Sequence, residues 1–286
     1  MKVHHILLIV FGLFLMNSCS VKSKEGERQL TVTIEPIKYF TEAIVGNKYI
    51  VHTMVPNGTS PETYDPTPQQ LVKLSKSKAL FYTGYLGFEQ LWMERLQENA
   101  PETTFFNLSE GVPLIEETEE HEGHTHKGGI EPHIWNSPKN ALIILHNIYS
   151  AVIDIDPENK AFYQENYEVE QQKIKATAQQ IDSLLKEPTQ SKSFMIYHPA
   201  LSYFSRDYGL TQLSIEEGGK EPSPYHLKEL INTAKENKVK VIFIQPEFDQ
   251  KNAAIIAKEV GAILVPINPL ATDWHQEIIH TAESLK

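Results

Sequence analysis

The chain lacks several features that mark large classes of protein. It has one cysteine, Cys19, and a single cysteine cannot form a disulfide within the chain. It has 26 basic residues against 37 acidic ones, and the formal net charge of −11 argues against binding to nucleic acid. No apolar run reaches the roughly 20 residues that a membrane-spanning helix needs. With 41% apolar residues, the chain can still bury a substantial core.

The longest apolar run lies near the first residue and extends from Ile6 to Met16. It follows a basic start and precedes small polar residues, an order typical of a secretory signal peptide over residues 1–18. Cys19 comes next and resembles the lipidated cysteine of a bacterial lipoprotein. The polar residues 19–29 would then be a flexible tether. We therefore expect an extracytoplasmic protein, lipid-anchored to a bacterial membrane in the periplasm or at the cell surface.

Short β-rich runs alternate with helical patterns in both halves of the chain. Strands are expected at residues 30–35, 50–55, 79–84, 103–108, 193–197, 211–215, 240–245 and 262–267. Helices are expected at residues 38–45, 68–77, 88–99, 224–237, 251–260 and 274–285. This alternation predicts an α/β fold in which helices cover parallel sheets.

A long polar helix separates the two halves. It is expected to begin after Asp156, with Pro157 in its first turn, and to stop before Pro188. Between Ile174 and Leu185, apolar residues recur every three or four positions and form one stripe. The sequence thus predicts two (βα) lobes joined by one helix. The predicted ranges are an N-terminal lobe at 30–154, a linking helix at 155–188 and a C-terminal lobe at 189–286.

Four side chains of the kinds that bind metals lie in proline-bounded turns. Glu62, His198 and Asn268 each follow a predicted strand, and His133 lies just before a helix. Ligands of parallel α/β sheets gather outside the carboxyl ends of the strands. Two of the four residues belong to each predicted lobe, so a cleft between the lobes could hold a small ligand. Imidazole and carboxylate are ordinary Zn²⁺ ligands, which favours a metal site.

Six segments resemble the metal-specific solute receptors of bacterial ABC importers, the zinc- and manganese-binding lipoproteins. In chain order they are TVTIEPIKYFTEAIVGN, PNGTSPETYDPTPQQL, EPHIWNSPKNA, YHPALSYFSRDYGL, KEPSPYHLKEL and INPLATDW. The resemblance covers nearly all of the chain after the tether. It implies two pseudo-symmetric lobes with the transported metal between them, a membrane permease as partner, a monomeric state and no enzymatic activity.

Two ligand positions depart from the pattern of this family. Most members have a histidine at the position of Glu62, and many have an aspartate at the position of Asn268, whereas His133 and His198 match. Glu62 still offers an oxygen ligand, but the carbonyl of Asn268 is a weak ligand for Zn²⁺. Water or another acid could take that place. The acids in question are Glu216, Glu217 and Asp273.

Three further histidines, His121, His124 and His126, lie in the acidic, glycine-flanked stretch 117–129. The stretch has no hydrophobic periodicity, so it is interpreted as a mobile loop. Zinc-type members of the family carry such histidine-rich loops near this place. The three histidines are therefore expected to be weak accessory zinc ligands. The alternative is a solvated loop without a role.

The favoured function is the extracytoplasmic capture of Zn²⁺ and its delivery to an ABC permease for import. A manganese receptor of the same type is one alternative, because Glu62 and Asn268 add oxygen ligands, which suit Mn²⁺. A zinc-dependent hydrolase is another, because two histidines and a glutamate also occur in catalytic zinc sites. A lipid-anchored, metal-dependent adhesin is the third.

Overall fold

The computed structural model describes residues 28–121, 124–186, 191–216 and 219–286. The predicted signal peptide, Cys19 and most of the predicted tether lie outside these ranges, as does Glu217. In the part of the chain that is described, no helix has both the length and the apolar character needed to cross a membrane.

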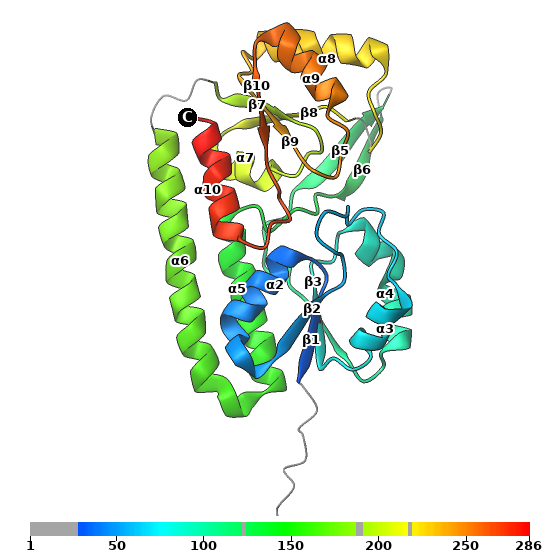
Figure 1. Cartoon of the computed structure of the whole chain (residues 1–286), viewed down its shortest axis with the longest axis vertical. Coiled ribbons are helices and arrows are strands. Elements are labelled where there is room, and N and C mark those ends of the chain that lie inside the picture. Colours follow the sequence, from blue (N-terminus) through cyan, green and yellow to red (C-terminus); the bar gives the residue numbers. More distant parts are fainter. Residues whose placement is uncertain (1–27, 122–123, 187–190, 217–218) are drawn as a thin grey trace, which may run out of the picture.

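The first lobe is built on a four-stranded parallel sheet (Figure 1). Its strands are β1 (Gln29–Val32), β2 (Ile50–Thr53), β3 (Ala79–Tyr82) and β4 (Thr104–Asn107). Its helices are α2 (Glu35–Val45), the 3₁₀ turn η1 (Gly46–Lys48), α3 (Pro68–Leu74) and α4 (Gly87–Asn99). The spatial order is β2-β1-β3-β4, so the first strand of the lobe lies between the second and the third.

The second lobe repeats this topology. Its strands are β7 (Ser193–Ile196), β8 (Thr211–Ser214), β9 (Val241–Ile244) and β10 (Ile263–Pro266), in the spatial order β10-β9-β7-β8. Its helices are α7 (Ser202–Tyr208), α8 (Pro224–Glu236), α9 (Lys251–Val260) and α10 (Trp274–Ser284). Again the first strand lies between the second and the third. The eight predicted strands and the two parallel sheets are confirmed, whereas α7 was not predicted.

Three helices begin with the same local device, a hydroxyl residue followed by proline. The pairs are Thr67–Pro68 in α3, Ser137–Pro138 in α5 (Pro138–Ile155) and Ser223–Pro224 in α8. Each hydroxyl accepts a hydrogen bond from a backbone N–H in the first turn, and each proline needs no N–H partner there. Each pair fixes the residue at which its helix begins. The segments that precede α3 and α5 carry Glu62 and His133.

Two helices connect the lobes. Helix α5 is followed by the 3₁₀ turn η2 (Pro157–Asn159) and then by α6 (Lys160–Lys186), which begins three residues later than predicted. Helix α6 has 27 residues, which corresponds to about 40 Å at 1.5 Å per residue. It runs alongside both lobes (Figure 1) and packs on α5, on α2 of the first lobe and on α10 of the second. One buried apolar cluster extends from the first sheet through these helices to the second sheet.

The stretch 117–129, predicted to be a loop, instead lies mostly in an antiparallel ribbon. Strand β5 (Glu116–His121) pairs with β6 (His124–Ile130), and Glu119 lies opposite His126. The prediction of a loop rested on missing hydrophobic alternation, which marks strands that bury one face. The ribbon is defined by backbone pairing, and such pairing does not require that alternation.

A buried carboxylate ties α6 to α10. Glu170 is 1% exposed and accepts hydrogen bonds from His275 Nε2 at 2.8 Å and from Lys173 Nζ at 3.1 Å. Burial alone would raise the pKa of Glu170, but the hydrogen bonds and positive charges of His275 and Lys173 outweigh burial and lower it. Glu170 is therefore ionised at neutral pH and holds the C-terminal helix against the long helix.

We expect Glu170→Ala to lower the free energy of unfolding by about 3 kcal/mol, the lower end of the cost of breaking a buried ion pair. The reason is that His275 would lose its acceptor in a mostly buried position. Urea unfolding followed by circular dichroism measures the difference. Glu165→Ala, at an exposed position of the same helix, is the control and should change stability by less than about 0.5 kcal/mol.

The difference between wild type and Glu170→Ala should depend on pH. Because the folded-state pKa of Glu170 is lowered, its contribution is fully present above the pKa of an unfolded glutamate, about 4.3. The contribution disappears as the pH falls through the lower folded-state value. Equal stability of the two proteins at pH 7 would contradict the role of this carboxylate.

Candidate metal centre

His133 lies in the turn between β6 and α5, where Glu131 fixes its orientation. Oε1 of Glu131 accepts a hydrogen bond from the backbone N–H of His133 at 2.8 Å and lies 2.7 Å from Nδ1 of the ring. Burial alone would raise the pKa of Glu131, but the charge of His133 and hydrogen bonds from His133 and Ser202 lower it. An ionised Glu131 holds the ring proton on Nδ1 of His133, which leaves Nε2 with a lone pair.

His198 lies two residues after the end of β7, and hydrogen bonds and a ring contact fix its position. Its Nδ1 lies 2.8 Å from Oε1 of Glu216, so this ring too is favoured with its proton on Nδ1. Its backbone N–H donates to Oε1 of Gln245 at 3.0 Å, and Nε2 of Gln245 donates to the carbonyl of His198 at 2.9 Å. The ring of Phe248 stacks on the imidazole, with 5.1 Å between centroids.

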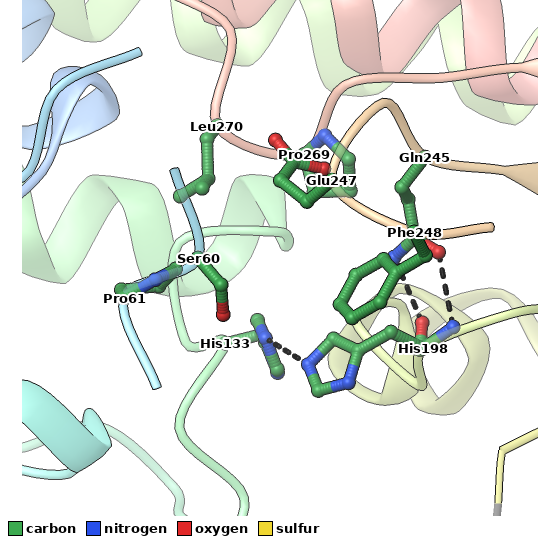
Figure 2. Close-up of a pocket in the computed structure, with 9 residues that line it drawn as sticks. All are labelled: Ser60, Pro61, His133, His198, Gln245, Glu247, Phe248, Pro269 and Leu270. Atoms are coloured by element: carbon green, nitrogen blue, oxygen red, sulfur yellow. Dashed lines mark hydrogen bonds between the residues drawn. The ribbon is translucent and has the colours of Figure 1, made fainter. Parts of the chain in front are cut away.

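The two imidazoles meet at their Nε2 atoms, which lie 3.2 Å apart. Figure 2 shows the rings facing one another across the pocket. With both protons held on Nδ1, two lone pairs point at each other, and this contact is unfavourable without a proton or a cation between them. Together with a carboxylate oxygen of Glu62, the donor atoms of His133 and His198 lie within 4.8 Å of one another. The arrangement is suited to a divalent metal ion.

Glu62 comes from the loop between β2 and α3 and is anchored by α4. Its Oε2 accepts a hydrogen bond from the backbone N–H of Gly87 at 3.1 Å. Its Oε1 is buried and makes no hydrogen bond to any described residue. A buried acceptor without a partner is costly, and a metal ligand in this position would remove that cost. A Cβ on residue 87 would lie 2.5 Å from the backbone oxygen of Glu62, so this approach requires glycine.

The two histidines line a pocket between the lobes, as predicted (Figure 2). First-lobe residues on one side face turns of the second lobe that follow β9 and β10. The lining residues are Ser60, Pro61, His133, His198, Gln245, Glu247, Phe248, Pro269 and Leu270.

Asn268, the fourth predicted ligand, is used in its own turn. Its Oδ1 accepts a hydrogen bond from the backbone N–H of Leu270 at 3.0 Å, and its backbone N–H donates to Glu277 at 2.7 Å. Its neighbours Pro269 and Leu270 line the pocket. The side-chain oxygen of Asn268 therefore stabilises the turn that forms part of the pocket wall in this structure.

The acids named as substitutes for Asn268 have other partners. Glu216 holds His198, and Asp273 caps α10 by accepting a hydrogen bond from the backbone N–H of Gln276 at 3.1 Å. Glu217 lies outside the described residues. Three predicted ligands are thus brought together, namely Glu62, His133 and His198.

Sequence reasoning missed Glu247, which lines the pocket in the turn after β9. Its Oε1 is buried without a hydrogen-bond partner in the described structure. Burial raises the pKa of this carboxyl, although a hydrogen bond to its own backbone and the charge of His198 oppose the rise. The signal was available, because Glu247 follows a strand and a proline just as the predicted ligands lie in proline-bounded turns.

Comparison with known proteins agrees with this fold and site. Residues 30–286 match the family described as zinc-uptake complex component A, periplasmic (ZnuA). The chain is 29% identical over 264 residues to the high-affinity zinc uptake system protein ZnuA of Bacillus subtilis (strain 168), covering 88% of this chain and 81% of that protein. It is 28% identical over 273 residues to the manganese ABC transporter substrate-binding lipoprotein PsaA of Streptococcus pneumoniae serotype 4, covering 91% of this chain and 87% of that protein.

A solved structure supports the same assignment. A crystal structure of ZnuA superposes with a TM-score of 0.81 at 35% identity and covers 90% of this chain and 97% of that one. The family match spans both sheets, the connecting helices and all the residues of the candidate centre. The chain therefore belongs to the ZnuA family, whose members are metal-binding solute-binding proteins of ABC importers and not enzymes.

Proposed function

We propose that this protein captures Zn²⁺ outside the cytoplasm and delivers it to the permease of an ABC importer, while a lipid on Cys19 anchors it to the membrane. The observation that carries the proposal is the 3.2 Å approach of the Nε2 atoms of His133 and His198. Each ring has its other nitrogen next to a buried carboxylate. The unpartnered Oε1 of Glu62 adds a third donor to the same place.

The donor set favours zinc over manganese. Imidazole suits Zn²⁺, and divalent affinities at a given site generally rise from Mn²⁺ to Zn²⁺. The carboxylate of Glu62 adds an oxygen that both ions accept. The relatives do not decide this point, because a zinc protein and a manganese protein are almost equally similar to this chain. The argument for zinc therefore rests on the two imidazoles.

Capture and delivery are compatible with ligands that come from separate parts of the chain. Glu62 lies in a loop of the first sheet and His198 at a strand end of the second sheet. A metal between them is held only while both loops keep their places. Docking on a permease that shifts either loop would weaken the site and release the ion.

We also propose that the histidines of the β5–β6 ribbon bind additional zinc more weakly than the central pocket does. The support is their number and spacing, with His121, His124 and His126 in one short ribbon. Imidazole is an ordinary Zn²⁺ ligand, so these residues are of a kind that can hold the ion. The ribbon would then gather zinc near the pocket without being the transported site.

We predict that His133→Ala and His198→Ala each lower zinc affinity at least tenfold. Loss of a direct ligand should exceed the roughly 10- to 100-fold loss that follows removal of an indirect partner. Isothermal calorimetry measures the dissociation constants. His226→Ala, which changes a half-buried histidine on α8, is the control. Wild-type affinity in both site variants would overturn the assignment of this pocket.

We predict that zinc displaces manganese when both are offered at equal concentration, for the reasons of affinity order given above. Elemental analysis of the protein after dialysis against the mixture measures the bound ratio. In cells that lack the protein, growth in chelator-treated medium should be restored by added zinc and not by manganese. Retention of manganese with exclusion of zinc would reverse the proposed specificity.

Deletion of residues 119–127 should remove the weaker zinc equivalents and leave one tight site. The deletion shortens both strands of the ribbon and does not touch the turns that carry Glu62, His133 and His198. Zinc titration of wild type and deletion compares the stoichiometry and the tightest dissociation constant. If the tight site disappears with the ribbon, the ribbon histidines are the primary ligands.

A further inference from the structure

We propose that Glu247 supplies the fourth ligand of the metal bound by Glu62, His133 and His198, in the role predicted for Asn268. The inference rests on the proposed function, because it requires a metal ion in this pocket. It deepens that function by naming the side chain that completes the coordination.

The turn that carries Glu247 is fastened to a ligand histidine. Gln245 makes two hydrogen bonds with the backbone of His198, one with its N–H and one with its carbonyl. Phe248 stacks on the imidazole of His198 and on the ring of Tyr197, with centroids 5.1 Å and 5.4 Å apart. Glu247 lies between these two contacts in the sequence. Its backbone position is therefore fixed relative to His198.

The carboxylate of Glu247 borders the pocket and lacks a partner on one oxygen. Its Oε1 is buried without a hydrogen bond to any residue that the structure describes. Glu62, whose donor oxygen lies close to those of the two histidines, has the same property. Figure 2 shows Glu247 beside Pro269, on the second-lobe wall above the two imidazoles. Glu247 thus brings a second buried, unpartnered carboxylate oxygen to the pocket that the two imidazoles line, in addition to that of Glu62.

Glu247 stands outside the group of three side chains whose donor atoms lie within 4.8 Å of one another. A glutamate side chain has three rotatable bonds, so its carboxylate can move while the backbone stays in place. In this proposal, the side chain of Glu247 rotates toward the ion last, after Glu62 and the two histidines have bound it. The contacts of Gln245 and Phe248 would remain unchanged during that movement.

Asn268 is the less suitable fourth ligand on both geometry and chemistry. Its Oδ1 already accepts a hydrogen bond from the backbone N–H of Leu270, so metal binding would compete for an oxygen that stabilises its own turn. Its neutral amide oxygen is also a weaker donor than a carboxylate, which is an ordinary Zn²⁺ ligand at about 2.0–2.2 Å. With Glu247 as the fourth ligand, a charged carboxylate binds the ion in place of the neutral amide of Asn268. The Oε1 atom of this carboxylate has no other partner among the described residues.

The resulting set of two nitrogens and two oxygens closes the coordination sphere. Catalytic zinc sites keep one position for water, whereas sites that only hold the ion use four protein ligands. Ligation by Glu247 would leave no water position in a tetrahedral site. This agrees with a family that binds and releases metal and does not catalyse a reaction.

The test compares Glu247→Gln with Asp249→Asn. Both changes remove one negative charge without changing size, in the same turn, but Asp249 is exposed and pairs with Lys251. We expect Glu247→Gln to lower zinc affinity at least about tenfold in competition with a chromophoric chelator, as for a direct ligand. Asp249→Asn should bind like wild type. Glu247→Asp should recover part of the loss.

Cobalt-loaded protein gives a second readout that reports coordination directly. Visible absorption of Co²⁺ is strong in four-coordinate sites and weakens when added water ligands raise the coordination number. Glu247→Gln should weaken and shift these bands, whereas Asp249→Asn should leave them unchanged. Thermal unfolding of the metal-free proteins checks folding, and Glu247→Gln should be at least as stable as wild type because it removes a buried charge. If it proves unfolded, Glu247→Asp carries the spectral comparison.

The outcomes separate this inference from the proposed function. If Glu247→Gln keeps wild-type zinc affinity and cobalt bands while His133→Ala loses binding, Glu247 is not a ligand and the proposed function stands. If His133→Ala and His198→Ala also bind like wild type, the pocket itself is not the metal site and both ideas fail.

Discussion

The candidate metal centre depends on two buried carboxylates that decide which nitrogen of each histidine faces the pocket. Glu131 and Glu216 each lie next to an Nδ1 atom, and both Nε2 atoms are thereby presented to the same point. Without these carboxylates, either ring could carry its proton on the wrong nitrogen, and the donor set would be lost. The two histidines are the candidate ligands, but Glu131 and Glu216 set their tautomers without contacting the ion themselves.

The short distance between the rings also requires two distant parts of the chain to hold their places. Trp135, beside the first histidine, donates a hydrogen bond to the carbonyl of Pro269, and Trp274 donates to the carbonyl of Trp135, each at 2.8 Å. Both indoles are buried, and they belong to the apolar cluster that continues along the connecting helices. These hydrogen bonds tie the segment that follows His133 to Pro269, a residue of the pocket wall.

Much of the architecture could be predicted because the responsible forces are local. The alternation of β-rich runs with helical patterns predicted both sheets. The rule that ligands follow strand ends pointed to Glu62 and His198, and the proline-bounded turn before a helix pointed to His133. The ribbon could not be predicted, because its pairing shows no hydrophobic alternation. The pairing of His198 with Glu216 was also out of reach, because it depends on how neighbouring strands align. Glu247 also follows a strand end, but the residues after the strand at 240–245 were not considered as ligands.

Gly87 has no side chain that could bind a metal, but the position of Glu62 depends on it. Its amide holds one oxygen of Glu62, and even a methyl group there would collide with the backbone of Glu62. Natural selection for metal uptake would therefore act on position 87 as strictly as on the histidines. A survey of natural variants should therefore find few substitutions of Gly87. Such substitutions would displace the Glu62 carboxylate, which lies 25 positions away in the chain.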